Sequence, residues 1–585
     1  MHLHPVLFGL FRFLLPACII ATSYLYLYPI INGCEFPSPA RFGGKKGPDT
    51  CIFESKPNNP FEDQDAISKA PPPPLPPIPE IAPLRLLALA DPQLEGDTSL
   101  PRVPNATIAA LEHAWFSLSN GKFHHAIRGT LRALREIIPD LVRAVRYVRK
   151  QLDLLGNDYY LAHVYRSVHW WTAPTHVTVL GDLLGSQWIG DEEFDRRSWR
   201  YWNRVLKGGT KTEMELLHPE NYNTSGPRKE VLGADPSWSQ RVINIAGNHD
   251  IGYAGDIDQS RVDRFERQFG PVNGDIVFKL PNTTSAQDPT IRILVLNTMN
   301  LDTPALSENL QISTYQFIND AISHSEPVES HSHFTILLTH IPLHKEQGVC
   351  MDSPLFDFFP DSKGGGVKEQ NMLSADLSRD AVLQGLFGKN PDRSVPARGM
   401  GRDGVILTGH DHEGCDVYHY AERAALNSEE DDGGEWKAAP WLSAETRQKL
   451  AHEDTPGVRE VTVRSVMGEF GGNVVLLSAW WDDESMRWRY EVGRCVLGIQ
   501  HIWWGIHALD IFTVSLGIAA IILYFRETRG SRQEIEGGTK GSADLMKHKN
   551  KLRSNESKST DRRETAHGRL GKASDTVTKT KLQKG

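Results

Sequence analysis

Five apolar runs of strand length each end in a short polar motif, and this pattern limits the fold more than any other feature of the chain. The runs are LRLLALAD (84–91), HVTVLGD (176–182), RVINIAGNHD (241–250), HFTILLTH (333–340) and VILTGHDH (405–412). Helical patterns lie between them, as in residues 107–153 and 191–206. Apolar strands that alternate with helices indicate a sheet covered on both faces. We therefore expect an α/β fold with the motifs gathered at the carboxyl ends of strands, where such sheets bind ligands.

The motif residues are carboxylates, amides and imidazoles. Asp91 and Asp182 follow apolar runs directly, and a lone carboxylate there is costly unless it meets a cation. His410 and His412 are two positions apart, so their rings lie on one side of an extended chain. Any one of these residues has an ordinary structural explanation, such as a hydrogen-bonded strand-end His. All five motifs in order predict a metal centre, and the donors suit Mn, Fe or Zn.

The motifs over residues 91–412 resemble the pattern of the calcineurin-like metallophosphoesterase superfamily, which is D-x-H, GD, GNH, a lone His and G-H-x-H. The resemblance implies a four-layer α-β-β-α sandwich, two divalent metal ions and two-metal hydrolysis of a phosphate ester. The metal ligands it implies are Asp91 and His412 on one ion, Asp182 between the two, and Asn248, His340 and His410 on the other.

One ligand position departs from the family pattern. Gln93 stands where the superfamily has a metal-binding His. A glutamine carbonyl is a weaker and harder donor than imidazole, so we expect Mn²⁺, with Fe or Zn as the alternatives. The resemblance also makes His249 the proton donor to the leaving oxygen. Asp250 is expected to orient that ring, or else to cap the helix that follows.

A closer resemblance covers residues 84–525. The segments GNDYYLAHVY (156–165), GSQWIGD (185–191), TGHDHEGCD (408–416), VMGEFGGN (466–473) and HIWW (501–504) are similar to the fungal post-GPI-attachment ethanolamine-phosphate phosphodiesterases. This resemblance implies removal of an ethanolamine-phosphate branch from a mannose of GPI anchors in the endoplasmic reticulum. GPI-anchored proteins would be the substrates, and the trimming would let cargo receptors export them.

Two long apolar segments frame the chain, at residues 13–31 and 502–525, and each is long enough to cross a bilayer. A cleaved signal peptide is the alternative for the first segment, and a buried core helix for the second. Residues 526–585 hold sixteen Lys and Arg against eight Asp and Glu. Basic flanks stay in the cytosol, so residues 32–500 are expected on the lumenal side. The closer resemblance implies that the compartment is the endoplasmic reticulum, with the Golgi as the alternative.

Glycosylation triplets and cysteines agree with a lumenal domain. Asn105, Asn223 and Asn282 begin N-x-S/T triplets, although Asn555 in the expected cytosolic tail does so too. Cysteines in an oxidising lumen form disulfides. The pairs Cys34–Cys51 and Cys350–Cys415 are possible, with free buried thiols as the alternative, since the sequence does not fix pairing.

The chain therefore divides into six parts. They are a cytosolic N-terminus (1–12), a transmembrane helix (13–31), a Pro-rich linker (32–83), the phosphoesterase domain (84–495, with a disordered insertion at 427–454), a second transmembrane helix (502–525) and a disordered basic tail (526–585). The net charge of -9 gives no reason to expect nucleic acid. Two other functions stay open: a lumenal phosphoesterase for another lipid or glycan, and a trafficking adaptor whose site is impaired at Gln93.

Two further features each have two interpretations. Trp188, Trp199, Tyr201 and Trp202 form either a sugar-stacking wall or the core face of a helix. Glu469 either reaches the site or shapes a turn.

Overall fold

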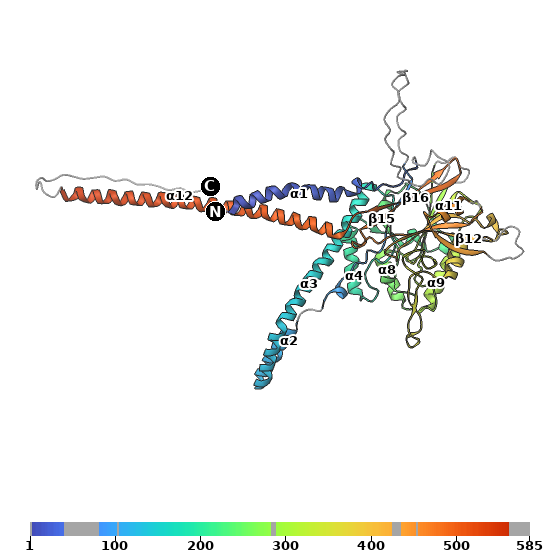
Figure 1. The fold of residues 1–585 in the computed structure, drawn as a ribbon, viewed down its shortest axis with the longest axis horizontal. Coiled ribbons are helices and arrows are strands. Elements are labelled where there is room, and N and C mark those ends of the chain that lie inside the picture. The colour runs from blue at the N-terminus through green and yellow to red at the C-terminus, as the bar shows by residue number, and fades with distance from the viewer. Residues whose placement is uncertain are drawn as a thin grey trace, which may run out of the picture. The chain divides into compact units, whose positions relative to one another are not determined.

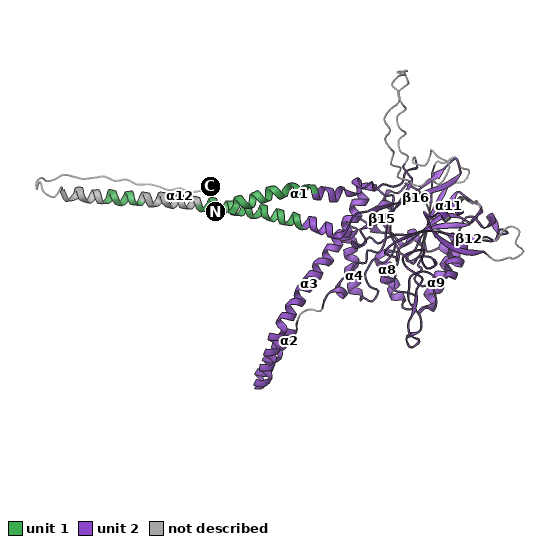
Figure 2. Ribbon diagram, viewed as in Figure 1, with its two compact units in different colours: residues 1–20, 508–585 green, residues 21–507 purple. Residues whose placement is uncertain are grey.

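Two mixed β-sheets form the core of residues 21–507 in the computed structural model (Figure 1). The structure describes residues 3–39, 81–101, 105–281, 288–423, 434–451 and 454–560. It divides into two compact units, one of residues 1–20 and 508–585 and one of residues 21–507 (Figure 2). The second unit holds both sheets and all five strand-end motifs.

The smaller sheet has six strands in the order β16-β15-β1-β2-β5-β3. Its bounds are β1 Leu84–Leu89, β2 His176–Val179, β3 Thr210–Lys211, β5 Arg241–Asn244, β15 Asn473–Asp482 and β16 Arg487–Val496. Strand β1 is parallel to β2, and β2 to β5. The antiparallel hairpin β15–β16 completes the sheet beside β1. Three motif-bearing strands therefore point the same way.

The larger sheet has eight strands in the order β13-β12-β14-β11-β8-β7-β6-β4. Its bounds are β4 Arg228–Val231, β6 Gly274–Lys279, β7 Thr290–Val295, β8 His333–Leu338, β11 Asp403–Thr408, β12 Cys415–Glu422, β13 Glu435–Pro440 and β14 Gly457–Thr462. Strands β8 and β11, which carry the two His motifs, are parallel neighbours. A separate pair, β9 (Phe356–Phe358) and β10 (Val367–Gln370), is antiparallel.

Alternating side chains build two apolar layers around each sheet. Leu86 and Ala88 of β1 share a core cluster with Ile336 of β8, which places that cluster between the two sheets. Leu87 and Leu89 point the other way. Period-two alternation explains this division of one strand. The helices pack on the outer faces, so the expected four-layer α-β-β-α sandwich is confirmed.

Several helices carry the outer layers. Their bounds are α2 Ala106–Ser119, α3 Phe123–Thr172, α4 Asp191–Arg200, α5 Met214–Leu217, α6 Tyr222–Ser225, α7 Asn248–Ile251, α8 Gln259–Phe269, α9 Glu308–Ser323, α10 Ala375–Leu377 and α11 Ala444–Ala451. The C-terminal half of α3 contributes Leu161 and Val164 to the cluster that holds Leu89 of β1. On the larger sheet, Phe317 and Ile318 of α9 belong to the same outer cluster as Leu337.

Two helices are long and apolar enough to cross a membrane, α1 (Leu3–Ile31) and residues 500–530 of α12 (Gln500–Thr560). In the unit formed by residues 1–20 and 508–585, Sγ of Cys18 donates to Oγ1 of Thr513 at 3.0 Å. The expectation of a disordered tail is wrong as far as residue 560, where α12 ends. Helix formers such as Glu, Lys, Arg and Gln extend the helix beyond its apolar part.

The sequence-based expectation for residues 427–454 is also wrong in the described part. Strand β13 pairs with β12 there, and α11 follows. The segment is poor in apolar residues, but β13 needs only backbone hydrogen bonds along the open side of β12. Residues 40–80 of the expected linker, Asn282, and residues 427–433, 452 and 453 of this insertion lie outside the described residues.

Two disulfides lie within the described part of the chain. Cys350 pairs with Cys415, which is one of the pairs considered above. Cys34 pairs with Cys495 and not with Cys51. Residue Cys34 follows α1 closely and Cys495 lies near the end of β16. Folding brings them together across almost the whole chain, which spacing in the sequence cannot indicate.

Candidate metal centre

Strand ends from both sheets converge to build the site. Asp91 lies two residues after β1, Asp182 three after β2, and Asn248 begins α7 after β5. His340 lies just after β8, and His410 just after β11. Asp91, Asp182 and His410 have positive φ angles of 52°, 50° and 73°. A strained backbone of this kind concentrates at functional sites, and here it turns each side chain out of its strand direction.

The candidate ligands form two groups that share one carboxylate. One group is Asp182, His340 and His410, and the other is Asp91, Asp182 and His412. Within each group the ligand atoms lie within 4.8 Å of one another. A carboxylate common to two adjacent N/O clusters is the arrangement that holds two divalent ions a few ångströms apart.

Backbone carbonyls fix the orientation of two imidazoles. Nδ1 of His340 lies 2.8 Å from the Leu180 carbonyl, and Nε2 of His410 lies 2.9 Å from the Gln370 carbonyl. A ring that donates one N–H to a carbonyl presents its other nitrogen as a lone-pair donor. These nitrogens both point at Oδ1 of Asn248, at 3.1 Å for His340 and 3.0 Å for His410. Burial lowers the pKa of His410 to about 3, so this ring is neutral and able to ligate.

Asp182 lies at the centre of the charge distribution. Burial disfavours its ionised form, but the charges of His340 and His249 hold the pKa of Asp182 well below its usual range. In turn, burial disfavours a charged His340, yet the Asp182 and Asp91 carboxylates raise the pKa of His340 to about 9. The two carboxylates thus favour a positive charge between them.

Asp91 supplies the clearest test of whether these residues fit a metal. Its Oδ1 accepts the backbone N–H of His410 at 3.1 Å, while its fully buried Oδ2 has no hydrogen-bond partner among the described residues. Burial, together with the charge of Asp182, raises the pKa of Asp91 well above its usual value. An unsatisfied buried carboxylate oxygen is costly unless a cation pairs with it. The donor set therefore fits divalent ions.

Gln93 occupies the position expected of a ligand. Its Nε2 lies 3.0 Å from Oδ2 of Asp182 and 3.0 Å from Nε2 of His412. The oxygen and nitrogen of an amide exchange places on a half-turn of the group. In that orientation Oε1 would face the same two atoms and a cation between them. The residue is thus positioned to ligate, through one oxygen.

His249 and Asp250 are adjacent but have different surroundings. Nε2 of His249 lies 3.8 Å from Oδ2 of Asp182, and its side chain is 36% exposed, which places it at the entrance of the site. Its Nδ1 is buried without a hydrogen-bond partner in the described structure. Asp250 instead accepts backbone N–H groups from Leu183, Leu184 and Gly247, at 3.1, 2.9 and 3.0 Å.

These contacts contradict the first of the two roles expected for Asp250, which is orientation of the His249 ring. Its oxygens are occupied by three backbone donors, and it caps α7 rather than orienting the His249 ring. The carboxylate ties the loop after β2 to the loop after β5, so it positions Asp182 and Asn248 relative to each other.

Two glycines allow the close packing of these loops. A Cβ atom on Gly181, whose φ is +87°, would collide with the ring of His340. A Cβ atom on Gly247 would collide with Asp182. Only glycine leaves room for the ligands at these positions.

Some residues at the site were not identified from the sequence. The Gln370 carbonyl comes from the end of β10, in a segment with no recognisable motif. The ring of Phe470 packs edge-on against His412, with centroids 5.2 Å apart. Phe470 belongs to the 466–473 segment, so that segment reaches the site, and Glu469 beside it influences the charge of His412.

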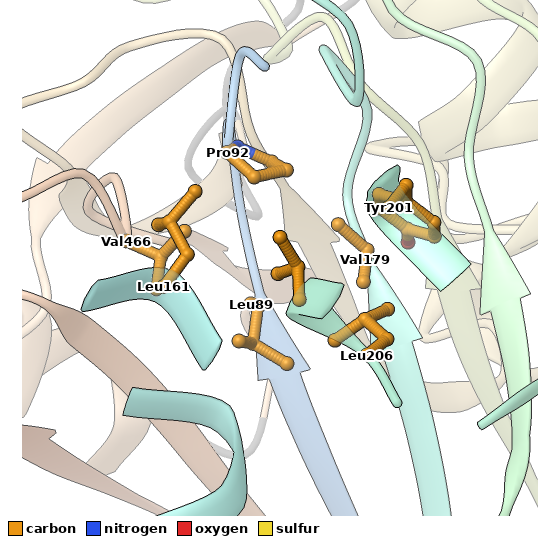
Figure 3. A pocket seen from close by; sticks show the side chains of 8 residues that line it. Leu89, Pro92, Leu161, Val179, Tyr201, Leu206 and Val466 are labelled. Carbon is orange, nitrogen blue, oxygen red and sulfur yellow. The ribbon is translucent and has the colours of Figure 1, made fainter. Parts of the chain in front are cut away.

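The four aromatic residues considered as a sugar wall do not form one surface. Tyr201 is fully buried, and Trp202 packs against the core. Trp188 and Trp199 are 62% and 56% exposed, and arginines lie over both rings. Tyr201 also lines a small apolar pocket with Leu89, Val179 and Leu206 (Figure 3). That pocket has no charged lining residue and is a packing gap beside the strands rather than the site.

Comparisons with known proteins agree with this geometry. Protein TED1 of Saccharomyces cerevisiae is 32% identical over 398 residues, covering 60% of this chain and 75% of its own. An uncharacterized protein of Schizosaccharomyces pombe is 26% identical over 63% of this chain and 80% of its own. Metallophosphoesterase 1 of Gallus gallus is 23% identical over 46% of this chain and 57% of its own. No family model matches the chain.

The sandwich and its ligand set are those of a calcineurin-like metallophosphoesterase, and the chain belongs to that superfamily. Within it, the chain belongs to the fungal group that contains Protein TED1. It is accordingly a phosphoesterase, and two helices of its described part are long and apolar enough to cross a membrane.

Proposed function

We propose that this protein is a two-metal phosphodiesterase that removes an ethanolamine-phosphate branch from a mannose of GPI anchors in the lumen of the endoplasmic reticulum. The single observation that carries the chemistry is the sharing of Asp182 between two ligand groups. The substrate rests on membership of the fungal group. Export of GPI-anchored proteins through cargo receptors would follow from the trimming.

The proposed ligands divide between two sites. Asp91, Gln93 and His412 would hold one ion, Asn248, His340 and His410 the other, and Asp182 both. When bound, divalent ions polarise phosphoryl oxygens and make water a nucleophile at neutral pH. Mn²⁺ is the proposed metal, because the set is rich in oxygen and Gln93 adds a hard donor; Fe and Zn are the alternatives.

The protein's own groups would do the remaining work. His249, at the entrance, would hold the proton that passes to the leaving alkoxide oxygen. The carbonyls of Leu180 and Gln370 would keep His340 and His410 in the ligating orientation. Asp250 would keep the two loops in register. Rigid placement of this kind lowers the reorganisation needed during the reaction.

Location follows from the ends of the chain. With the basic residues after 526 in the cytosol, the catalytic domain would lie in the lumen. The Cys34–Cys495 and Cys350–Cys415 disulfides suit an oxidising compartment. Asn105 and Asn223 are both exposed and accessible to glycosylation there.

Mass spectrometry of GPI glycans from cells that lack the protein tests the substrate. Retained ethanolamine phosphate on a mannose, restored to normal by the wild-type chain but not by Asp182→Asn, is the expected result. An unchanged glycan would refute the GPI assignment. Purified protein assayed on a generic phosphodiester with and without Mn²⁺ tests the hydrolase separately, and would expose an inactive adaptor.

A further inference from the structure

Helices α2 and α3 form a helical hairpin that the catalytic site does not use. Small residues join the two helices: a Cβ on Gly129 would lie 2.8 Å from Cβ of Ala114. Oδ2 of Asp140, from α3, accepts the backbone N–H of Thr107 in the first turn of α2 at 2.6 Å. The hairpin is therefore a built element, and it belongs to the unit of residues 21–507 (Figure 2).

A row of large apolar side chains on α3 faces outward. We call it the apolar stripe, and its members are Phe123, Ile127, Leu131, Leu134, Ile138 and Leu141. Each is between 58% and 72% exposed. The spacing of three or four residues places them on one face of the helix, and it continues through Val145, Val148 and Leu152. An apolar surface this long is expected to have a partner.

Helix α2 widens the apolar surface with aromatic rings. Trp115 and Phe116 are 72% and 69% exposed, close in sequence to the turn where Phe123 begins α3. A seam for one partner helix needs only a narrow stripe. Trp and Phe beside a leucine-rich face are typical of helices that lie in a membrane interface.

A row of arginines runs beside the apolar stripe. Five of them each follow an apolar residue of the row by one position: Arg128, Arg132, Arg135, Arg146 and Arg149. One position is about 100° around a helix, so the arginines flank the apolar face. Residues 105–155 hold eight Lys and Arg against four Asp and Glu, although the whole chain has a net charge of -9. Such a flank suits lipid phosphates.

Residues 156–163, in the C-terminal half of α3, contact the two apolar helices. Gly156 lies directly against Trp504, since a Cβ there would collide with that ring. The rings of His163 and Tyr26 have centroids 4.8 Å apart. Trp504 and Tyr26 lie in the terminal turns of the two helices able to cross a membrane, where interfacial aromatics are expected. In a bilayer spanned by those two helices, this part of α3 would lie at the level of the membrane surface.

We propose that the α2–α3 hairpin lies on the bilayer surface that faces the catalytic domain, with the apolar stripe among the acyl chains and the arginines at lipid phosphates. From residue 123 to residue 152 the contact would run about 45 Å. The hairpin would hold the catalytic domain in a fixed orientation relative to the membrane. Its candidate site would then be within reach of a phosphodiester carried by a lipid. The lipid contact itself does not depend on the catalytic function proposed above.

The test uses the full chain in nanodiscs of phosphatidylcholine and phosphatidylinositol. In a Cys18→Ser, Cys51→Ser background, Leu134→Cys carries an environment-sensitive NBD dye, and Arg132→Cys is the matched control on the flank. Quenching by lipids that carry a doxyl group near the head group should be several times stronger at position 134. Both positions are exposed, so the fold is not at risk.

Two outcomes would overturn the proposal. Equal quenching at positions 134 and 132 would mean that the stripe does not enter the bilayer. Absent quenching at 134, together with oxidative cross-linking between copies through Leu134→Cys, would assign the face to a second copy of the chain. Neither readout requires enzyme activity, so failure of the proposed reaction would leave this test intact.

Discussion

The amide nitrogen of Gln93 lies 3.0 Å from Oδ2 of Asp182. One side of the candidate metal centre therefore has one imidazole, His412, beside the Gln93 amide, whereas the other side has two imidazoles beside the Asn248 amide. Asp182 belongs to both sides, so under the proposed two-metal function the asymmetry would affect one ion more than its neighbour. This relationship leads to the first prediction.

Replacing Gln93 with His should strengthen metal binding at the Asp91–His412 side. Imidazole is the better donor for transition metals, so we expect about a tenfold or larger gain in affinity for the weaker ion, comparable to known effects of altering a metal's surroundings. Preference should also shift from Mn²⁺ toward Zn²⁺. Metal titration by calorimetry checks this, with Gln93→Asn as the control. Unchanged affinity would mean that position 93 does not face the ion.

Asp182→Asn should remove both ions, because the shared carboxylate is lost while the side chain keeps its size. We expect hydrolysis of a generic phosphodiester to fall by about 10³-fold, the scale seen when a central electrostatic group is removed. Metal content per chain, measured by mass spectrometry of the elements, should fall in parallel. Full metal content with normal activity would contradict the assigned centre.

His249→Gln should slow the reaction in a way that depends on the leaving group. A general acid contributes about 10²–10⁴-fold when the leaving oxygen needs a proton. Hydrolysis of an alkyl phosphodiester should therefore fall by that factor, whereas a nitrophenyl diester, which leaves without a proton, should change little. Equal losses on both substrates would give His249 a different role.

Asp250→Asn should lower stability as well as activity, since three backbone N–H groups depend on that carboxylate.

Lys345→Met should destabilise the larger sheet. Nζ of Lys345 lies 2.8 Å from Oε2 of Glu460, and both residues are buried. Breaking a buried pair on one side costs about 3–5 kcal/mol. Thermal unfolding in detergent, followed by tryptophan fluorescence, measures the loss. Lys345→Met combined with Glu460→Gln should recover part of it, because the amide carries no unpaired charge and can still meet the Leu343 N–H and His419; no recovery would mean that the unpaired charge is not the cause.

The same pair predicts a pH dependence with a definite sign. Burial disfavours the ionised Glu460, but the charge of Lys345 and the hydrogen bond with His419 lower its pKa to about 2. The folded pKa is below the unfolded value of about 4.3. Its contribution to stability is therefore complete above that value and is lost as the pH falls toward 2. In Lys345→Met the pKa of Glu460 should rise toward the unfolded value, so the acid-dependent loss of stability below pH ~4.3 should be smaller, as unfolding midpoints measured across an acid series would reveal.

Peptide mapping without reduction should recover Cys34 joined to Cys495. Replacing both cysteines with serine should lower the free energy of unfolding by about 2–5 kcal/mol. A peptide that joins Cys34 to Cys51 would contradict the structure.

Local sequence predicted the strand ends well. Asp91, Asp182 and His410 each follow an apolar run that forms a buried strand, and parallel neighbours bring those ends to one edge. The pattern of side chains along β1 was enough to predict a sheet covered on both faces. Two sheets facing each other were expected from the family resemblance, because alternation within a strand does not say what covers either face.

The remaining features depend on contacts distant in the sequence. Asp250 follows His249 directly, so adjacency favoured a pairing, but the turn of α7 aims the carboxylate at the Leu183 and Leu184 backbone. The Gln370 carbonyl carries no side-chain signal at all. Strand β13 is stabilised by its neighbour β12 and not by its own composition, which is why it was expected to be disordered.

The Cys34–Cys495 disulfide also determines which fragments a protease can release from the protein. It closes residues 34–495 into a covalent ring, and the apolar helices α1 and α12 leave that ring on either side of one disulfide. Cutting a single peptide bond anywhere inside the ring opens it but releases nothing, because both fragments stay joined through sulfur. Two cuts within the ring are needed to release a segment from both anchors, because after a single cut one fragment keeps α1 and the other keeps α12 even when the disulfide is reduced. Nicked protein would therefore run as an intact chain on a gel until the sample is reduced.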